Sequence, residues 1–408
     1  RTRGMKSSTR LFVRAGPREF THFNPHDVRA AVVTCGGLCP GLNNVIREIV
    51  RSLYLLYGCD HVLGIRGGYS GFYDRTLPPI TMTPDMVKSV HHQGGTFLGS
   101  SRGGFDLEKI MLFLEETGVN QLYIIGGDGT HRGAHIIAME CLERGLNIAV
   151  AGIPKTIDND VALIDRSFGF QSSVEEAQAA IKSAKVEAMC NLPRGIGIVK
   201  LMGRSSGFIA AYSTLASGDV DLCLVPEAPL VLEGPQGCLG HLKRRVMQKG
   251  HAVVVVAEGA GEELLGKNPK TDASGNKILP KIGEFMKAEI ERYFSAQGLP
   301  TAVKYIDPSY MIRSVKANSS DSLYCMQLAQ NAVHGAMAGF TAFTVGMMGN
   351  RLVYIPIPEL TKASPRTMTP HGRTWERVLG TTRQPNTVPL PRRCAKPAEP
   401  ILQHKGTL

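Results

Sequence analysis

Short apolar runs alternate with helix-length amphipathic segments along most of the chain, and small or polar residues follow most of these runs. Residues 30–34 form the first run, and a glycine-rich turn after it leads into a helix expected over residues 42–57. Residues 62–65 are predicted to form the next strand. Two further runs, 122–125 and 148–153, flank one helix-length segment. Strand, glycine loop, helix and strand in this order predict a βαβ unit with parallel strands.

The same alternation continues in the second half of the chain and predicts a second α/β set. The expected class is therefore α/β, with two Rossmann-like lobes, parallel-rich sheets and an active site in the cleft between the lobes. Beyond Pro356 the chain becomes rich in Pro, Thr and Arg, so a mostly irregular tail is expected there. The predicted helices of the second half lie at 174–189, 208–216, 236–249, 283–297 and 320–340. Its predicted strands lie at 196–201, 221–225 and 252–257, and a strand pair near 342–355 closes the folded part.

The composition fits a globular enzyme-sized protein of 408 residues, with 43% hydrophobic and 20% charged residues. The net charge of +11 is dispersed along the chain without aromatic interleaving, which favours small anionic substrates over nucleic acid.

Nine cysteines without a C-x-x-C pair predict reduced thiols in the cytoplasm. No apolar run reaches the ~18–20 residues that span a membrane. The first fourteen residues, basic and without acids, fit an exposed leader or the end of a transit peptide, so a plastid is the alternative compartment.

Two acidic loops follow the strands of the central βαβ unit. The first is Gly-Gly-Asp-Gly-Thr at 126–130, and the second is Pro-Lys-Thr-Ile-Asp-Asn-Asp at 154–160. Because the carboxyl ends of parallel strands meet at one edge of a sheet, Asp128, Asp158 and Asp160 are expected to crowd one crevice. Carboxylates repel one another, so a cation or a reacting hydroxyl is expected between them. This pattern predicts Mg²⁺-dependent phosphoryl transfer, with Asp128 facing the metal.

The two loops differ in how much they specify. The first also fits a capped turn, and kinases of NAD and of lipids carry similar loops, so it does not choose the acceptor. In an extended second loop Thr156, Asp158 and Asp160 would point to the same side, and one carboxylate would take the proton of an attacking hydroxyl. A near-match to a phosphate-binding loop at 261–268 and the pair His91-His92 are interpreted as a surface loop and a helix end.

Several longer motifs lie between residues 13 and 357. They are CGGLCPGLNNVIRE, GGTFLGSSRGGFD, GGDGTHRGA, GIPKTIDND, GIVKLMGRSSGFIA, VPEAP, AEGAG and YIDPSYMIR. In these motifs the chain resembles the phosphofructokinase family, and within it the ATP-dependent type of plants and algae. This resemblance implies phosphorylation of the C1 hydroxyl of fructose 6-phosphate by Mg-ATP, which gives fructose 1,6-bisphosphate and ADP in the committed step of glycolysis. It also implies a homo-oligomer, either a dimer or a tetramer, and no membrane or nucleic-acid partner.

The resemblance also implies roles for individual residues. Asp158 would be the general base, Asp160 would support it, Arg204 would also lie near the transferring phosphoryl group, and Asp128 would hold Mg²⁺. The phosphates of the nucleotide would contact Gly36, Arg102, Gly103, Gly127, Asp128, Gly129 and Thr130. The sugar phosphate would contact Thr156, Ile157, Asp158, Met202, Gly203, Arg204, Glu227, Lys304, Tyr310, Met311, Ile312 and Arg313.

The same resemblance divides the chain into regions. Residues 1–28 would be a leader and linker, 29–168 a nucleotide-binding lobe completed by about 312–357, 169–311 a sugar-phosphate-binding lobe, and 358–408 a Pro- and Arg-rich tail. At the residues that bacterial members of the family use to share a site between subunits, this chain has Gly195 and Lys304. Site sharing and allostery of the bacterial type are therefore open.

Two residues bear on the choice of phosphoryl donor. Lys155 is typical of pyrophosphate-dependent relatives, whereas Gly129 stands where those enzymes have a second aspartate. A carboxylate at 129 would repel the α-phosphate of ATP, and glycine leaves room for it, so Gly129 favours ATP. A pyrophosphate-dependent enzyme and a non-catalytic regulatory subunit are the alternatives.

Overall fold

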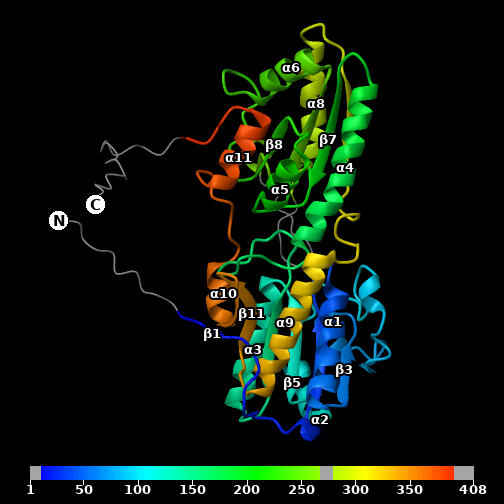
Figure 1. The fold of residues 1–408 in the computed structure, drawn as a ribbon, viewed down its shortest axis with the longest axis vertical. Coiled ribbons are helices and arrows are strands. Elements are labelled where there is room, and N and C mark those ends of the chain that lie inside the picture. The colour runs from blue at the N-terminus through cyan, green and yellow to red at the C-terminus, as the bar shows by residue number, and fades with distance from the viewer. Residues whose placement is uncertain (1–10, 267–278, 390–408) are drawn as a thin grey trace, which may run out of the picture.

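The computed structural model describes residues 11–266 and 279–389, which form two α/β halves along the long axis of the molecule (Figure 1). The first half contains an eight-stranded sheet in the order β1-β12-β11-β6-β5-β2-β3-β4, and the second a four-stranded sheet in the order β10-β7-β9-β8. All neighbours in the second sheet are parallel, and antiparallel pairing in the first sheet is confined to β1, β4 and β12. The expected class, two α/β lobes with parallel-rich sheets, is confirmed.

The first sheet carries helices on both faces. Helices α1 and α9 share one hydrophobic cluster with one face of the sheet, and α2, α3 and α10 share another with the opposite face. Its strands are β1 (Val13–Arg14), β2 (Arg29–Thr34), β3 (His61–Ile65), β4 (Ile80–Thr81), β5 (Gln121–Gly126), β6 (Ala149–Pro154), β11 (Phe343–Met348) and β12 (Arg351–Pro356). Its helices are α1 (Leu42–Arg51), α2 (Leu107–Thr117), α3 (Asp128–Glu143), α9 (Ser319–Met337) and α10 (Ile357–Ala363).

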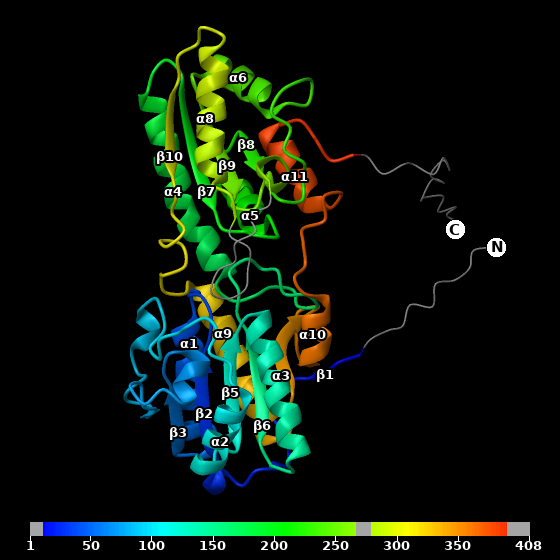
Figure 2. The ribbon, with the colours of Figure 1, turned by 180° about the vertical axis from the view of Figure 1, so that it is seen from behind.

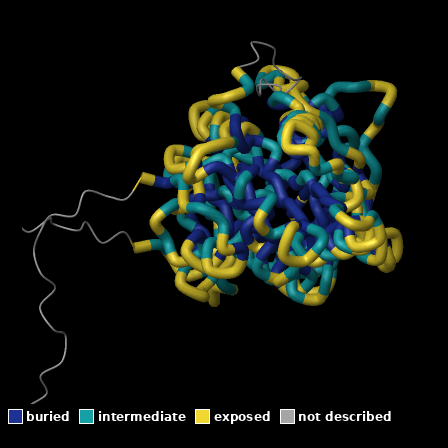
Figure 3. Tube along the Cα trace, turned by 90° about the horizontal axis from the view of Figure 1, so that it is seen from above, coloured by how far each residue is buried: buried dark blue, intermediate teal, exposed yellow. Residues whose placement is uncertain are grey.

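The second sheet is also covered on both faces, because side chains alternate along its buried strands. In β9, Val254 faces the cluster that contains α6 and α8, and Val255 faces the one that contains α4 and α5. Figure 2 shows α8 over one face of this half, and Figure 3 shows the buried residues enclosed by exposed loops and helix faces. The strands are β7 (Gly195–Leu201), β8 (Leu222–Leu224), β9 (His251–Ala257) and β10 (Ala302–Ile306), and the helices α4 (Phe170–Cys190), α5 (Phe208–Ser217), α6 (Cys238–Lys249), α7 (Glu262–Leu265), α8 (Ile282–Ser295) and α11 (Arg373–Thr382).

The C-terminal region corrects the expectation of a mostly irregular tail. Residues 358–389 include most of α10 and all of α11, and Trp375 and Val378 are buried against the second half. Trp375 and Val378 lie three residues apart on one face of α11, and that face packs on the core while the other face of the helix stays accessible. The remaining tail, 390–408, and the first ten residues of the predicted leader lie outside the described residues. Within the described ranges no helix combines the length and the apolar character needed to cross a membrane.

Candidate active site

A cavity of about 550 Å³ lies between the two halves, where strands of both sheets end. Strands β2, β7, β9 and β10 all point their carboxyl ends toward it, which is where open α/β sheets bind ligands. Its lining is rich in glycine, serine and charged side chains, as expected for an anionic ligand. The lining residues are Gly36, Gly37, Leu38, Ser100, Ser101, Arg102, Lys200, Met202, Arg204, Glu258, Asp307, Ser309, Tyr310 and Arg313.

The second acidic loop follows β6 as a compact turn, so the extended geometry expected from the sequence is wrong. Asn159 has a left-handed backbone with φ of 57°, and its side-chain oxygen accepts a hydrogen bond from the Ser167 amide at 2.9 Å. The hydroxyl of Thr156 donates to the Asp160 carboxylate at 3.0 Å and accepts from the Asp158 amide at 3.1 Å. The threonine hydroxyl thus closes a local turn, binding the backbone of Asp158 and the side chain of Asp160.

Asp158 is the least satisfied acid of this loop. Its buried Oδ1 atom has no hydrogen-bond partner among the described residues. Burial raises the pKa of Asp158 well above its usual range, the charges of Asp160 and Glu258 raise it further, and Arg204 opposes them. A buried carboxylate oxygen without a donor is costly, so it is expected to receive a proton or a hydrogen bond from a ligand.

Asp128 is the first residue of α3 and joins the same group of acids. Burial and the charge of Asp160 raise the pKa of Asp128 to about 6, while Arg132 and a hydrogen bond with Ser364 act against this rise. The structure thus brings Asp128, Asp158 and Asp160 together. None of the three lines the cavity itself. Asp158 is nevertheless near enough to the cavity residues Glu258 and Arg204 for their charges to shift its pKa.

Gly126 and Gly129 of the first acidic loop differ in whether the fold requires glycine at their positions. A Cβ atom at Gly126 would lie 2.4 Å from Thr130 Cγ2, so the fold excludes a side chain there. At Gly129 a Cβ atom would meet only the tip of Arg132, at 4.0 Å, and the residue is exposed in the first turn of α3. The fold therefore does not require glycine at position 129.

Lys155 lies behind the cavity wall. It is buried, its ammonium donates to the carbonyl of Gly37, and burial lowers its pKa. Gly36 has φ of +85°, and a Cβ atom there would come within 3.2 Å of Lys155 Nζ. Lys155 therefore supports the Gly36-Gly37 turn from behind, and it does not line the cavity.

Arginines supply the positive charge of the cavity. Arg102 and Arg313 approach Gly37 from two different loops, with guanidinium nitrogens 3.6 and 3.8 Å from a Cβ placed there. Arg313 stacks 5.0 Å from the centre of the Tyr310 ring, and its buried Nε has no hydrogen-bond partner among the described residues. Arg204 lines the same cavity. Guanidinium groups that converge from two elements suit a phosphate group.

Several of the predicted sugar-phosphate residues lie away from the cavity. Both carboxylate oxygens of Glu227 accept from the Gly207 amide, at 2.9 and 3.0 Å, and Oε1 also accepts from the Met368 amide at 2.8 Å. The Ile312 side chain is buried in the core, and its carbonyl accepts from the Ser173 hydroxyl. Lys304 is exposed on the edge strand β10, outside the cavity lining.

Sequence reasoning missed other charged residues of the cavity. Glu258 directly follows β9, and burial raises its pKa although Lys200 and Arg204 oppose the rise. Lys200 also forms an ion pair of 2.8 Å with Asp307. The signal for Glu258 was present in the motif AEGAG, because an acid after a buried parallel strand is the same pattern that identified Asp158.

Comparison with known proteins gives consistent matches. A model of the family described as phosphofructokinase matches residues 29–336. ATP-dependent 6-phosphofructokinase 7 of Arabidopsis thaliana is 51% identical over 378 residues, covering 92% of this chain and 77% of the relative. ATP-dependent 6-phosphofructokinase of Borreliella burgdorferi is 47% identical over 383 residues, covering 92% and 85%.

The fold has solved counterparts. A pyrophosphate-dependent phosphofructokinase from Marinobacter aquaeolei superposes with a TM-score of 0.71 at 19% identity, covering 93% of this chain and all of that one. Phosphofructokinase from Saccharomyces cerevisiae superposes with a TM-score of 0.67 at 23% identity, where this chain spans 48% of the yeast chain. At these identities the likeness concerns the fold alone, and the sequence matches carry the assignment. This chain belongs to the phosphofructokinase family.

Proposed function

We propose that this protein transfers the γ-phosphoryl group of ATP to the C1 hydroxyl of fructose 6-phosphate, giving fructose 1,6-bisphosphate and ADP in the committed step of glycolysis. The observation that carries the proposal is the unpartnered, buried oxygen of Asp158 beside an arginine-lined cavity. A bond forms between the C1 oxygen and the γ-phosphorus, the bond to the β-phosphate oxygen breaks, and the hydroxyl proton passes to Asp158. A raised pKa makes Asp158 a better proton acceptor near neutral pH than an ordinary carboxylate.

The nucleotide is proposed to bind the first half, residues 29–168 completed by 312–357. The amide groups at the start of α3 favour an anion, and the open Gly129 leaves space for a phosphate beside them. Arg102 and the Gly36-Gly37 turn border the cavity from the same half, and Gly103, Gly127 and Thr130 complete the proposed phosphate contacts.

Mg²⁺ is part of this proposal, and the residues present fit it. Burial raises the pKa of Asp128 and of Asp160, and the charge of Asp160 adds to the rise at Asp128. A bound cation would favour the charged form of both carboxylates. The described residues hold no group of three or more His, Cys, Asp or Glu side chains that could form a complete metal site. In phosphoryl transfer Mg²⁺ is commonly bound by one or two carboxylates together with phosphates and water. Asp128 would hold the ion, which neutralises charge on the transferring phosphates.

The sugar phosphate is proposed to bind the second half, residues 169–311, and Arg313. Arg204 and Arg313 are the phosphate ligands, with Met202 and Tyr310 beside them in the cavity lining. Gly203, next to both Met202 and Arg204 in the chain, belongs to the same proposed contact. The proposal moves the acidic contact from Glu227 to Glu258, because Glu258 lines the cavity while backbone amides occupy Glu227.

Replacing Glu258 or Glu227 with glutamine distinguishes an acid that contacts the sugar phosphate from one that stabilises the fold. We expect Glu258→Gln to raise KM for fructose 6-phosphate by roughly tenfold or more, since a hydrogen bond from a charged group contributes about 1.5–3 kcal/mol. In Glu227→Gln the new amide group meets the Gly207 amide donor, so the thermal midpoint should fall more than affinity does. Steady-state kinetics and thermal unfolding measure both, and a larger rise of KM in Glu227→Gln would reverse the assignment.

One assay tests the function as a whole. Purified protein, Mg²⁺ and fructose 6-phosphate are supplied with ATP or with pyrophosphate, and fructose 1,6-bisphosphate is measured. We expect turnover with ATP, and turnover with pyrophosphate alone would reject ATP as the donor. No turnover with either donor, but activation of a homologous subunit, would instead indicate a regulatory chain.

Two further assignments belong to the proposal. We propose a homo-oligomer, as a dimer or tetramer, which light scattering of the purified protein checks.

We propose the cytoplasm as its compartment, because the described cysteines are all free thiols. A plastid is the alternative, since a relative named chloroplastic from Arabidopsis thaliana is 50% identical over 92% of this chain.

A further inference from the structure

The segment that joins α10 to α11 crosses from the first half of the molecule to the second, as both ribbon views show (Figures 1 and 2). We call residues 364–368 of this segment the strap. Ser364 and Arg366 hydrogen-bond to the residues around and just after Asp158, and Met368 hydrogen-bonds to Glu227. Neither the family motifs nor the cavity lining include any of these three strap residues.

Arg366 makes four hydrogen bonds to the acidic loop and the residues just after it. Its backbone amide donates to the Asp160 carbonyl at 2.7 Å, and its Nε donates to the Asn159 carbonyl at 3.0 Å. Its two terminal nitrogens donate to the carbonyls of Ile164 at 2.9 Å and Asp165 at 3.2 Å. One planar guanidinium group therefore fixes the backbone of residues 159–165 at several points.

This loop needs such support. Asn159 and Leu163 both have left-handed backbones, with φ of 57° and 67°; asparagine tolerates this conformation, but for leucine it is unfavourable. The carbonyls of residues 159, 160, 164 and 165 are not used by a sheet, and Arg366 supplies their donors. The loop conformation that holds Asp158 and Asp160 together thus depends on a residue about two hundred positions away, since Arg366 and Asn159 are 207 residues apart.

The strap also reaches the loop that carries Arg204. The Arg366 guanidinium stacks over the ring of Phe208, the first residue of α5, at 5.2 Å. Two residues later, the Met368 amide donates to Glu227, which also accepts from the Gly207 amide at the start of the same helix. The strap therefore joins the loop of Asp158 in the first half to the start of α5 in the second half, directly after the loop of Arg204.

The first residue of the strap contacts the remaining carboxylate. The Ser364 hydroxyl accepts from the Ala162 amide at 3.0 Å and hydrogen-bonds to Asp128. Asp128 and the loop of Asp158 and Asp160 are thus hydrogen-bonded to the strap, and the start of α5, just after the loop of Arg204, contacts it through Phe208.

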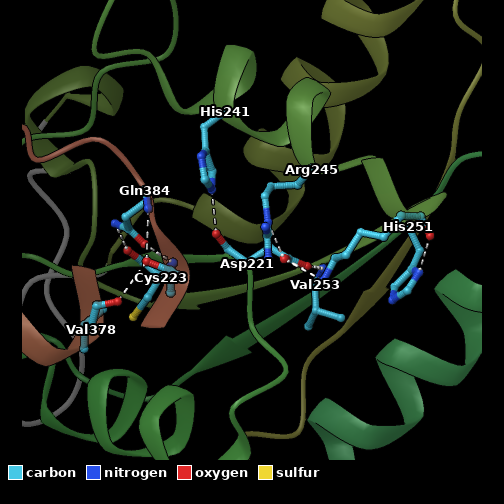
Figure 4. Close-up of polar contacts among 10 residues, drawn as sticks. Asp221, Cys223, His241, Arg245, His251, Val253, Val378 and Gln384 are labelled. Carbon is cyan, nitrogen blue, oxygen red and sulfur yellow. Dashed lines mark hydrogen bonds and ion pairs between the residues drawn. The ribbon is translucent and has the colours of Figure 1, made fainter. Parts of the chain in front are cut away.

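Packing and hydrogen bonds fix the chain on both sides of the strap. Before it, Ile357 and Leu360 of α10 are buried in the first half. After it, Trp375 and Val378 of α11 are buried in the second half. The Gln384 side chain then pairs with both backbone groups of Cys223 on the edge strand β8, at 2.7 and 2.8 Å (Figure 4). A segment fixed at both ends can hold its intervening residues in one place.

We propose that Arg366 is a positioning residue for phosphoryl transfer, which holds the Asp158 loop in its turn and against the start of α5. The inference rests on the proposed kinase function. Because Arg366 does not line the cavity, it affects the placement of the base rather than the affinity for either substrate. A misplacement of about 1 Å between reacting groups costs on the order of 100-fold in rate.

Three variants test this role in the full-length protein. We expect Arg366→Ala to lower kcat by roughly 10- to 100-fold with KM for both substrates little changed. Arg366→Lys, which keeps the charge and fewer of the hydrogen bonds, should recover part of this loss. The matched control is Arg377→Ala, which removes an exposed arginine of α11 and is expected to keep the kcat of the unaltered protein. Thermal unfolding of each variant shows how much of the protein is folded during the assay.

Amide hydrogen exchange gives a readout that does not need activity. Exchange within residues 158–165 should become faster in Arg366→Ala, while exchange in the core of β6 stays as it was. If kcat and this exchange both match the unaltered protein, or if KM rises and kcat does not fall, the positioning role is wrong. If the unaltered protein itself shows no turnover with fructose 6-phosphate, the proposed function is what fails. The exchange measurement still decides whether Arg366 holds the loop.

Discussion

Replacing Asp158 with asparagine is expected to lower kcat by about 10²- to 10⁴-fold, the usual contribution of a general base. The amide keeps the size of the side chain and its contacts with the loop, so substrate affinity should change much less than kcat. Asparagine cannot accept the hydroxyl proton, which isolates the proton transfer from binding. Steady-state kinetics with fructose 6-phosphate and Mg-ATP give both constants.

The same substitution is expected to stabilise the fold at neutral pH. Burial raises the pKa of Asp158 above its unfolded value, so the stability linked to this group is complete below the unfolded pKa and is lost as pH rises through the folded pKa. Asparagine carries no such penalty at any pH. The thermal midpoint of Asp158→Asn should therefore exceed that of the unaltered protein at neutral pH, and the difference should vanish near about pH 4.

The matched control for this prediction is Asp85→Asn, at an exposed acid that belongs neither to the acidic loops nor to the cavity lining. It should leave kcat and the thermal midpoint unchanged. A kcat for Asp158→Asn within a few-fold of the unaltered protein would remove Asp158 as the base. Lower stability at neutral pH would show instead that its charge is well compensated in the folded protein.

The parts of the site that the sequence predicted share one physical origin. Buried parallel strands are readable as apolar runs, and their carboxyl ends meet at one edge, so the residue after each run is a candidate ligand. This rule alone predicts that Asp128 and Asp158 lie together, and it places Arg204 just after the end of β7. Glu258 follows the same rule at the end of β9.

The rule does not say which way a side chain turns after the strand. Glu227 and Glu258 both follow strands of the second sheet, yet one accepts from the amides of Gly207 and Met368 and the other lines the cavity. The difference depends on Met368, which reaches Glu227 from the strap that crosses between the halves. A single sequence carries no periodic signal for such a contact.

The strap was missed for a related reason. Arg366 lies between two short helices in a segment rich in Pro and Thr, and its partners are backbone carbonyls that any residue has. Composition therefore indicated an irregular tail, while the burial of Trp375 and Val378 gives the tail a fixed course.

Strand β10 was missed because it is a half-exposed edge strand, in which only Val303 is buried.

The second large effect is expected at Gly129, where aspartate should reduce kcat/KM for ATP by about 100-fold or more. The fold accepts a side chain there, since a Cβ atom would meet only Arg132 at 4.0 Å. An acidic residue in the first turn of a helix also interacts favourably with the helix dipole, so the thermal midpoint should not fall. The loss of kcat/KM would therefore come from repulsion between the new carboxylate and the phosphates of ATP. Like charges forced together cost several kcal/mol, and about 1.4 kcal/mol corresponds to a factor of ten in rate.

Gly129→Asn and Gly129→Ala separate charge from size. If repulsion of the nucleotide phosphates is the cause, asparagine should lose much less ATP activity than aspartate, and alanine should lose least. The relative use of pyrophosphate should rise in Gly129→Asp, because pyrophosphate has no third phosphate to place near residue 129. Equal losses for asparagine and aspartate would indicate crowding. An unchanged kcat/KM for ATP in Gly129→Asp would mean that the donor passes elsewhere, and the donor choice would then have to depend on the charge of Lys155 behind the Gly36-Gly37 turn.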